Sequence, residues 1–140
     1  MITVVDASVA LKWFLQESDT EHAMRLRERH LTGEILLAAP DLLLYEVGNA
    51  LRFKHDFTVT GIQEALTALL RLQLELIGPT ERLLHHAVAL ARQSRLTYYD
   101  ALYLAAASEL EARLITADKR LHEAAGTLVN ATLLRQLDVS

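Results

Sequence analysis

The sequence predicts an α/β protein of three layers, in which helices cover both faces of a mainly parallel five-stranded sheet. Short apolar runs alternate along the chain with longer amphipathic stretches, as they do in repeated βαβ units. The apolar runs are nearly continuous, which is typical of strands that are buried on both faces. The connections between elements are brief, so we expect residues 1–140 to form one domain.

Five short apolar runs supply the predicted strands. They are Ile2–Val5, Glu34–Ala39, Leu74–Ile77, Arg113–Thr116 and Thr127–Val129. A helical pattern separates each run from the next, as parallel pairing requires. Residues that directly follow parallel strands share one edge of the sheet, and open α/β sheets bind their ligands there.

Capping residues mark the starts of the predicted helices. Ser8 is expected to cap a helix that continues to Leu15, and Asp41 to cap the helix that carries Glu46. Further starts are predicted by capping-box spacing and by a turn led by proline; these signals are Thr60 with Gln63, Thr97 with Asp100, and Pro79-Thr80-Glu81. Gly126 is expected to close the short helix that follows Asp118.

The composition is that of a folded protein, with 51% hydrophobic and 23% charged residues. There is no cysteine, which excludes a disulfide framework and a thiolate metal site and fits a reducing compartment. The first residues lack the features of a signal peptide, and no apolar run approaches the roughly 18 residues that would span a bilayer. We therefore expect a cytoplasmic protein that does not bind membranes.

The net charge of −4 comes from 14 basic and 18 acidic side chains. An acidic balance usually argues against nucleic acid, because phosphate contacts need lysine and arginine. If four of the acids hold a metal ion, the remaining chain is neutral, with 14 basic and 14 acidic side chains. Charge alone therefore does not exclude a nucleic-acid substrate.

Four acidic residues stand beside core-forming segments, where an unpaired charge is costly. Asp6 and Asp118 directly follow predicted strands, while Glu46 and Asp100 fall in the early turns of predicted helices. No lysine or arginine is adjacent to Asp6, Glu46 or Asp100 in the sequence. These acids meet only if the fold brings their segments together, and a divalent cation is then the expected counter-charge.

Such a cluster predicts a magnesium or manganese site. Two like charges about 4 Å apart repel by about 4 kcal/mol at an effective dielectric near 20, and a divalent cation relieves this repulsion. Magnesium prefers oxygen ligands and is commonly held by a few carboxylates together with a substrate phosphate. Because a bound metal ion also lowers the pKa of water, the cluster indicates hydrolysis of phosphodiesters.

Each acid also has a purely structural explanation. Asp6 and Asp118 can each cap the helix that follows, and Asp100 can be the third residue of a capping box. Glu46 is harder to explain in this way, because it shares its helix face with leucines; Asn49, one turn further on, is expected to orient it. The combination of these acids is more specific than any one of them.

Basic residues near the same predicted edge are candidates for contacts with substrate phosphate. They are Lys12, Arg95, Lys119 and Arg120. Five of the aromatic residues are expected to lie in the core or in a dimer interface; they are Trp13, Phe14, Tyr98, Tyr99 and Tyr103. The sequence contains no glycine-rich phosphate loop and no serine–histidine or cysteine nucleophile pattern.

Four segments, in order and spacing, resemble the motifs of PIN-domain ribonucleases. They are Val4-Val5-Asp6-Ala7-Ser8, Tyr45-Glu46-Val47-Gly48-Asn49-Ala50-Leu51, Leu96-Thr97-Tyr98-Tyr99-Asp100-Ala101-Leu102-Tyr103-Leu104-Ala105 and Ile115-Thr116-Ala117-Asp118-Lys119-Arg120-Leu121. The small size of the chain is similar to that of the VapC toxins of prokaryotic toxin–antitoxin pairs. Each motif is weak alone, but the ordered set covers essentially the whole chain.

The resemblance implies a sheet of order 3-2-1-4-5 and a site for one or two Mg²⁺ or Mn²⁺ ions. The ligands it implies are Asp6, Glu46, Asp100 and Asp118, and the residues at supporting positions are Ser8, Asn49 and Thr116. It further implies endonucleolytic hydrolysis of RNA, a homodimer, and a cognate antitoxin protein that occludes the site. Lys119 and Arg120 stand where some relatives carry a further acid, which leaves a second metal position open.

One alternative to a nuclease remains open, and another is disfavoured. The chain can be a catalytically silent PIN-fold module that regulates by dimerising or by sequestering a partner. A phosphatase or phosphoreceiver of similar architecture is disfavoured, because Asp6-Ala7-Ser8 lacks the second aspartate of such phosphatases, and the tandem acids of a receiver are absent.

Overall fold

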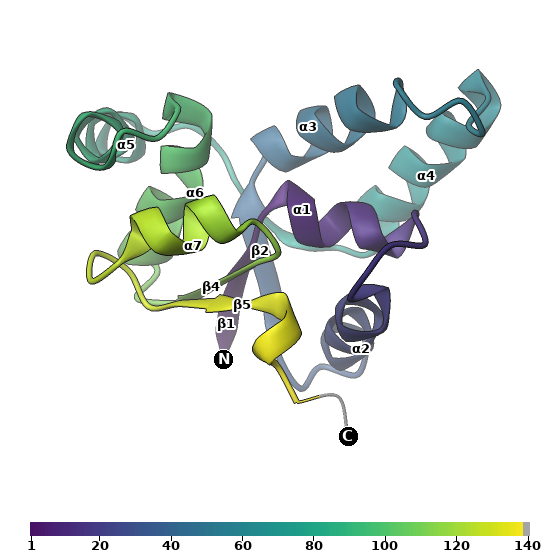
Figure 1. The fold of residues 1–140 in the computed structure, drawn as a ribbon, viewed down its shortest axis with the longest axis horizontal. Coiled ribbons are helices and arrows are strands. Elements are labelled where there is room, and N and C mark those ends of the chain that lie inside the picture. The colour runs from purple at the N-terminus through teal and green to yellow at the C-terminus, as the bar shows by residue number, and fades with distance from the viewer. Residues whose placement is uncertain (139–140) are drawn as a thin grey trace.

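The computed structural model describes residues 1–138 and contains a five-stranded sheet of order β3-β2-β1-β4-β5 (Figure 1). All neighbouring strands are parallel. The strands are β1 (Ile2–Val5), β2 (Leu36–Pro40), β3 (Glu75–Ile77), β4 (Arg113–Thr116) and β5 (Ala131–Leu133). Both the predicted fold class and the predicted strand order are confirmed.

Helices cover the two faces of this sheet. They are α1 (Ala7–Ala10), α2 (Thr20–Leu31), α3 (Leu42–Leu51), α4 (Val59–Arg71), α5 (Glu81–Ser94), α6 (Tyr98–Glu109) and α7 (Lys119–Ala125), with 3-10 turns η1 (Leu11–Trp13) and η2 (Leu134–Gln136). Right-handed crossovers place the helices between β1 and β3 on one face and those between β3 and β5 on the other. Figure 1 shows this division, with α1–α4 toward the right and α5–α7 toward the left.

The strand order reverses direction between β1 and β4, which are neighbours in the centre of the sheet. Val4 of β1 pairs with Ala38 of β2 on one side and with Leu114 of β4 on the other. Asp6 and Ala117, the residues that follow β1 and β4, therefore leave the sheet side by side. This is the switch point at which open α/β sheets bind ligands.

Helix α6 forms the centre of the core on one face. It buries every residue from Ala101 through Ala107 and packs against α5 as well as β1, β2 and β4. A helix covered on nearly all sides is apolar around its whole circumference, which explains its run of alanine and leucine. The core thus fixes Asp100 at the start of α6, near the edge where the strands end.

Three predicted strands differ in position from the observed ones, and β3 differs only in starting at Glu75 rather than at residue 74. Strand β5 comprises Ala131–Leu133 rather than 127–129, because a turn follows α7 and Leu128 N donates to Ala125 O at 2.8 Å. Pairing with β4 starts only at Asn130, whose carbonyl accepts from Leu114 N at 2.9 Å. Strand β2 starts at Leu36 rather than at residue 34, because the N–H groups of residues 34 and 35 both donate to Arg29 O at the end of α2.

The helix starts were predicted with mixed success. Thr97 and Gly126 cap α6 and α7 as expected, but α4 is capped by Thr58 and not by Thr60. The first helix is capped by Asp6 rather than Ser8, and η1 ends it at Trp13 instead of continuing to residue 15. Asp41 precedes α3 without a capping bond from its side chain. Within residues 1–138, no helix is both long and apolar enough to cross a membrane.

Candidate active site

Asp6 lies at the end of the central strand with only 5% of its surface exposed. Its Oδ1 accepts hydrogen bonds from Ser8 Oγ at 2.6 Å and from Val9 N at 3.4 Å. Its Oδ2 accepts from Thr116 Oγ1, at the end of β4, at 2.7 Å. The carboxylate is therefore held on both oxygens by groups from two adjacent strand ends.

The same hydroxyl groups fix the segment that carries Asp118. Ser8 Oγ accepts from Ala117 N at 2.9 Å, and Thr116 Oγ1 accepts from Asp118 N at 3.0 Å. Each hydroxyl thus donates to Asp6 and accepts from the backbone beyond β4. The network ties the ends of β1 and β4 together and places Asp118 beside Asp6.

Burial raises the pKa of Asp6 from 3.8 to about 6. Hydrogen bonds from Ser8, Thr116 and Val9 oppose this rise, and the charge of Asp118 adds to it. Desolvation of the carboxylate outweighs the bonds that it receives. A cation near Asp6 would therefore stabilise its ionised form strongly.

Glu46, one turn into α3, is oriented by a residue of α6. Its Oε1 accepts from Tyr103 Oη at 2.5 Å, and Tyr103 is 1% exposed. Burial raises the pKa of Glu46, the bond from Tyr103 lowers it, and Asp100 raises it again. Burial and the charge of Glu46 raise the pKa of Tyr103, so the phenol stays protonated and acts as the donor.

Asp118 and Asp100 lie on the side of the site toward α7. Asp118 caps α7 by accepting from Arg120 N at 2.9 Å and from Leu121 N at 3.4 Å. Arg120 reaches back, and its Nη2 donates to Asp100 Oδ2 at 3.5 Å. Burial and the charge of Asp118 raise the pKa of Asp100, while Arg120 and Thr97 lower it.

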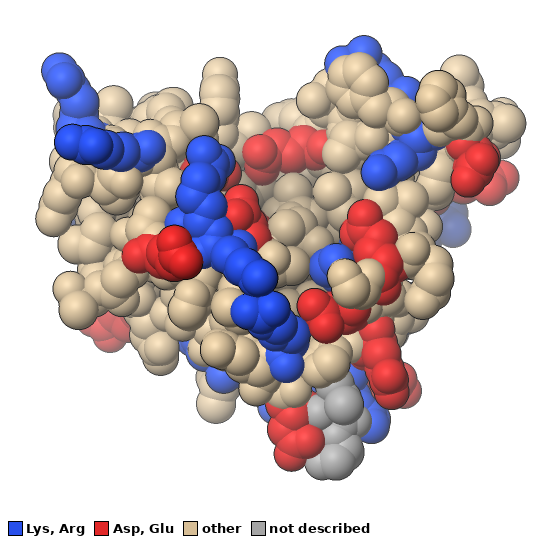
Figure 2. All heavy atoms as spheres, in the orientation of Figure 1, with Lys and Arg blue, Asp and Glu red and all other residues tan. Residues whose placement is uncertain are grey.

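The structure brings these acids to one edge of the sheet, and we call Asp6, Glu46, Asp100 and Asp118 the acidic rim. Their charges act on one another, because Asp118 raises the pKa of both Asp6 and Asp100, and Asp100 raises that of Glu46. Figure 2 shows acidic and basic side chains around a hollow in the middle of this face, between the two groups of helices. Asp6 and Asp118 also cap the helices that follow them, so the helix-capping roles predicted for these two acids are confirmed.

The donor set of the acidic rim suits a divalent cation. All its ligand atoms are carboxylate oxygens, and burial together with mutual repulsion disfavours their ionised forms until a cation offsets them. Among residues 1–138, no three acidic or histidine side chains are already gathered closely enough to hold an ion. Asp100 lies against Arg120 and Glu46 against Tyr103, so metal binding requires these side chains to adjust.

The predicted supporting residues behave differently from one another. Ser8 and Thr116 contact Asp6, whereas Asn49 is exposed and its Oδ1 accepts from Arg52 at 3.1 and 3.2 Å. Asn49 therefore does not orient Glu46 in this structure, and Tyr103 does so instead. One signal for this role was visible in the sequence, because Tyr103 lies one helical turn after Asp100 on the core-facing helix.

The basic residues predicted to contact phosphate differ in their burial and in their partners. Lys12 is 8% exposed and bonds Glu17 Oε1 at 3.4 Å, and with Lys119 it lines a cavity of about 240 Å³. Arg120 is hydrogen-bonded to the carboxylate of Asp100. Arg95 is exposed at the end of α5, where its φ of 60° places it in the left-handed region.

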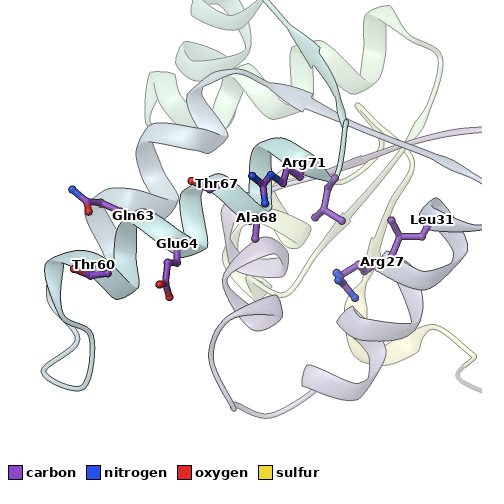
Figure 3. Close-up of a pocket in the computed structure, with 9 residues that line it drawn as sticks. Arg27, Leu31, Thr60, Gln63, Glu64, Thr67, Ala68 and Arg71 are labelled. Carbon is purple, nitrogen blue, oxygen red and sulfur yellow. The ribbon is translucent and has the colours of Figure 1, made fainter.

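A larger cavity, of about 500 Å³, lies away from the acidic rim between α2 and α4 (Figure 3). Arg27 and Leu31 line it from α2, opposite Glu64 and Arg71 of α4. None of the predicted site residues lines this cavity. Its mixed lining lacks the converging carboxylates that make the acidic rim chemically distinctive.

The chain is similar to a known protein family in sequence and to solved structures in fold. Residues 3–127 match the family model of the PIN domain. The chain is 36% identical to ribonuclease VapC1 of Mycobacterium tuberculosis over 76% of this chain and 81% of the relative. It is 31% identical to ribonuclease VapC3 of Pyrobaculum aerophilum over 92% of this chain and 98% of the relative. A toxin-antitoxin complex from Klebsiella pneumoniae has a similar fold, with a TM-score of 0.67 and 17% identity over 96% of this chain and 99% of the other.

Proposed function

The chain belongs to the PIN-domain family, in its group of VapC ribonucleases, and we propose that it is a metal-dependent endoribonuclease that acts as the toxin of a toxin–antitoxin pair. The observation that supports this most strongly is the acidic rim. Its carboxylates come from segments far apart in the sequence and lie at one edge of the sheet, where their charges act on one another and the pKa of three of them is raised. Such an arrangement is costly to the fold unless a cation and a phosphate use it.

Asp6, Glu46, Asp100 and Asp118 would hold one or two Mg²⁺ or Mn²⁺ ions. When bound, a divalent ion lowers the pKa of water and offsets the charge that develops on phosphorus. Asp6 provides the fixed point of this site, because Ser8 and Thr116 hold both of its oxygens. Tyr103 keeps Glu46 turned toward the rim.

The substrate of the proposed enzyme is RNA. Lys12, Arg95, Lys119 and Arg120 are our candidates for contacts to its phosphates, which orient the strand without reading its sequence. Arg120 would have to leave Asp100 to make such a contact, since the two now lie 3.5 Å apart. Because the Lys119-Arg120 pair brings positive charge beside Asp118, we favour one tightly held ion over two.

The central test replaces Asp6 with asparagine, which keeps its shape and removes its charge. Cleavage of a mixed RNA pool in Mg²⁺ or Mn²⁺ should fall by about 10³-fold or more in Asp6→Asn, and growth inhibition should disappear. Asp56→Asn, an exposed acid between α3 and α4, is the matched control and should keep full activity. Undiminished metal-dependent cleavage by Asp6→Asn would end this assignment.

The partners that we propose are a cognate antitoxin and a second copy of the chain, and we propose that the protein acts in the cytoplasm. The VapC relatives and the similar toxin-antitoxin complex support the antitoxin. Exposed apolar side chains on α3, α5 and α6 support a homodimer, among them Tyr45 at 68%, Val88 at 55% and Tyr99 at 58% exposure. Sedimentation of the purified chain alone and with its neighbour-encoded protein tests both.

Two observations favour a second function, that of a silent binding module. Arg120 already supplies a positive charge to Asp100, and no three ligands are preassembled among residues 1–138. If so, calorimetry should detect no Mn²⁺ binding at micromolar to millimolar concentration, and a broad RNA panel should stay intact. Binding of Mn²⁺ that is lost in Asp6→Asn would exclude this alternative.

A further inference from the structure

A cavity of about 240 Å³ adjoins the acidic rim on the side of β4 and β5. Its lining comes from η1, from the loop before α2, from the residues after β4 and from the end of β5 with η2. The segments that follow β4 and β5 leave the sheet at the same edge, because these strands are parallel. Ala117 lines it, and Ala117 lies directly between Thr116, which bonds Asp6, and Asp118. The cavity and the acidic rim are therefore neighbours along one edge.

The charged lining of this cavity is mainly basic. Lys12, Lys119 and Arg135 contribute positive charges, and Asp19 contributes the one carboxylate of the lining among residues 1–138. Asp19 also faces His22 at 4.0 Å. We call this cavity the basic pocket; it collects three cations beside the acids of a chain whose net charge is −4.

The cations of the basic pocket are available to a ligand to different degrees. Lys12 is 8% exposed, and its single ion pair within residues 1–138, to Glu17, is long at 3.4 Å. Lys119 and Arg135 are exposed, and neither forms an ion pair with another residue in the range 1–138. A buried lysine flanked by two exposed cations attracts an anion of small size and high charge density.

From this arrangement we infer that the basic pocket binds the RNA phosphate next to the one that is cleaved. This rests on the proposed function, in which the scissile phosphate lies at the acidic rim. Lys12 at the floor and Arg135 at the mouth hold the neighbouring phosphate, and Ser18 adds a hydroxyl donor. The strand then runs along the carboxyl edge of the sheet, so Arg135 fixes the register of the RNA without reading a base.

The test pairs a change in the protein with a change in the RNA. Arg135→Gln should raise KM about tenfold on a defined single-stranded RNA, with little change in kcat. In the wild type, the same rise in KM should follow when a neutral methylphosphonate replaces the phosphate on one particular side of the cleaved linkage. If the two groups touch, the variant and the modified RNA combined should show no further loss. The inference is wrong if the losses caused by Arg135→Gln and by the methylphosphonate multiply whichever of the two adjacent linkages carries the methylphosphonate.

Arg82→Gln is the matched control. Arg82 pairs with Glu109 at the opposite end of α6 from Asp100, so it lies far from the acidic rim and should leave KM unchanged. Inorganic phosphate serves as a competitor that separates the two sources of the same chemistry. If free phosphate inhibits the wild type through Arg135 while the methylphosphonate has no effect, the pocket takes a free anion and the inference is wrong.

Binding measured without metal separates this inference from the proposed function. Fluorescence anisotropy of labelled RNA in EDTA gives the slope of log Kd against log salt, which should fall by about 0.7 in Arg135→Gln and stay constant in Arg82→Gln. An unchanged slope in Arg135→Gln would refute the pocket even if the enzyme is active. If the wild type cleaves no RNA but the slope is reduced in Arg135→Gln, the nuclease proposal is refuted and the basic pocket is still supported as an RNA phosphate site.

Discussion

The two ends of the acidic rim are held in different ways. Asp6 is buried, and its two oxygens accept bonds from Ser8 and Val9 in α1 and from Thr116 at the end of β4. Asp100 is partly exposed, and the long side chain of Arg120 reaches its carboxylate at 3.5 Å. Hydrogen-bonded strands hold a group more precisely than one long side chain does. The comparison suggests a fixed anchor at Asp6 and an adjustable ligand at Asp100.

Breaking the anchor should have the largest effect. Thr116→Val removes the donor to Asp6 Oδ2 and the acceptor of Asp118 N, while keeping the shape of the side chain. We expect a fall of about 100-fold in kcat and a loss of about 2 kcal/mol in the free energy of unfolding, because buried polar groups lose their partners. Steady-state kinetics and urea denaturation measure the two. Near-normal values for both would mean that Asp6 needs no anchor.

The burial of Asp6 should also make the free energy of unfolding depend on pH. The pKa of Asp6 is about 6 in the folded protein against 3.8 as its ordinary value, so the folded state binds the proton more tightly than the unfolded chain. The free energy of unfolding in EDTA should therefore fall as pH rises from about 4 to about 6, by on the order of 3 kcal/mol from this group.

Asp6→Asn is the control for this measurement, because the difference in stability between it and the wild type isolates Asp6 from other acids. That difference should grow across the same pH interval and then level off. Saturating Mn²⁺ should restore the stability of the wild type above pH 6 and not at pH 4.5. A difference that does not vary with pH would show that Asp6 is not destabilised when it ionises.

The middle of the rim is tested by Tyr103→Phe, which removes the donor to Glu46 and leaves the ring in the core. Glu46 should lose its preferred orientation, and Mn²⁺ affinity measured by calorimetry should weaken about tenfold. Tyr98→Phe, at the start of the same helix, is the matched control and should not alter affinity. Equal Mn²⁺ affinity in both variants would leave Tyr103 with a packing role alone.

The adjustable end should respond least and in the opposite direction. Arg120→Gln frees Asp100 from a competing cation, so Mn²⁺ affinity should improve by roughly two- to fivefold. The gain should shrink at high salt, because the ion pair is exposed and screened. Weaker Mn²⁺ binding in Arg120→Gln would show instead that Arg120 orders Asp100 for the metal ion.

Local patterns predicted some features well and others poorly. Strands β1 and β4 were predicted to the residue, because buried parallel strands are uninterrupted apolar runs with an acid or a turn at each end. Strand β5 was misplaced because Val129 is buried by packing alone, and a buried turn residue has the same apolar character as a strand residue. Asn49 was preferred to Tyr103 because spacing within one helix is visible in a sequence and contact between two helices is not.

By itself, the amino-acid sequence determined the fold class, the strand order through its family resemblance, and the identity of the acidic rim. These depend on periodicity, on caps and on motifs, which are all local properties of the chain. Only the tertiary structure decided which groups hold each acid, how far burial raises their pKa values, and that Arg135 joins Lys12 and Lys119 in the basic pocket. The physical reason is that hydrogen bonds, desolvation and electric fields depend on distances in space, and residues 6 and 116 become neighbours only when β1 pairs with β4.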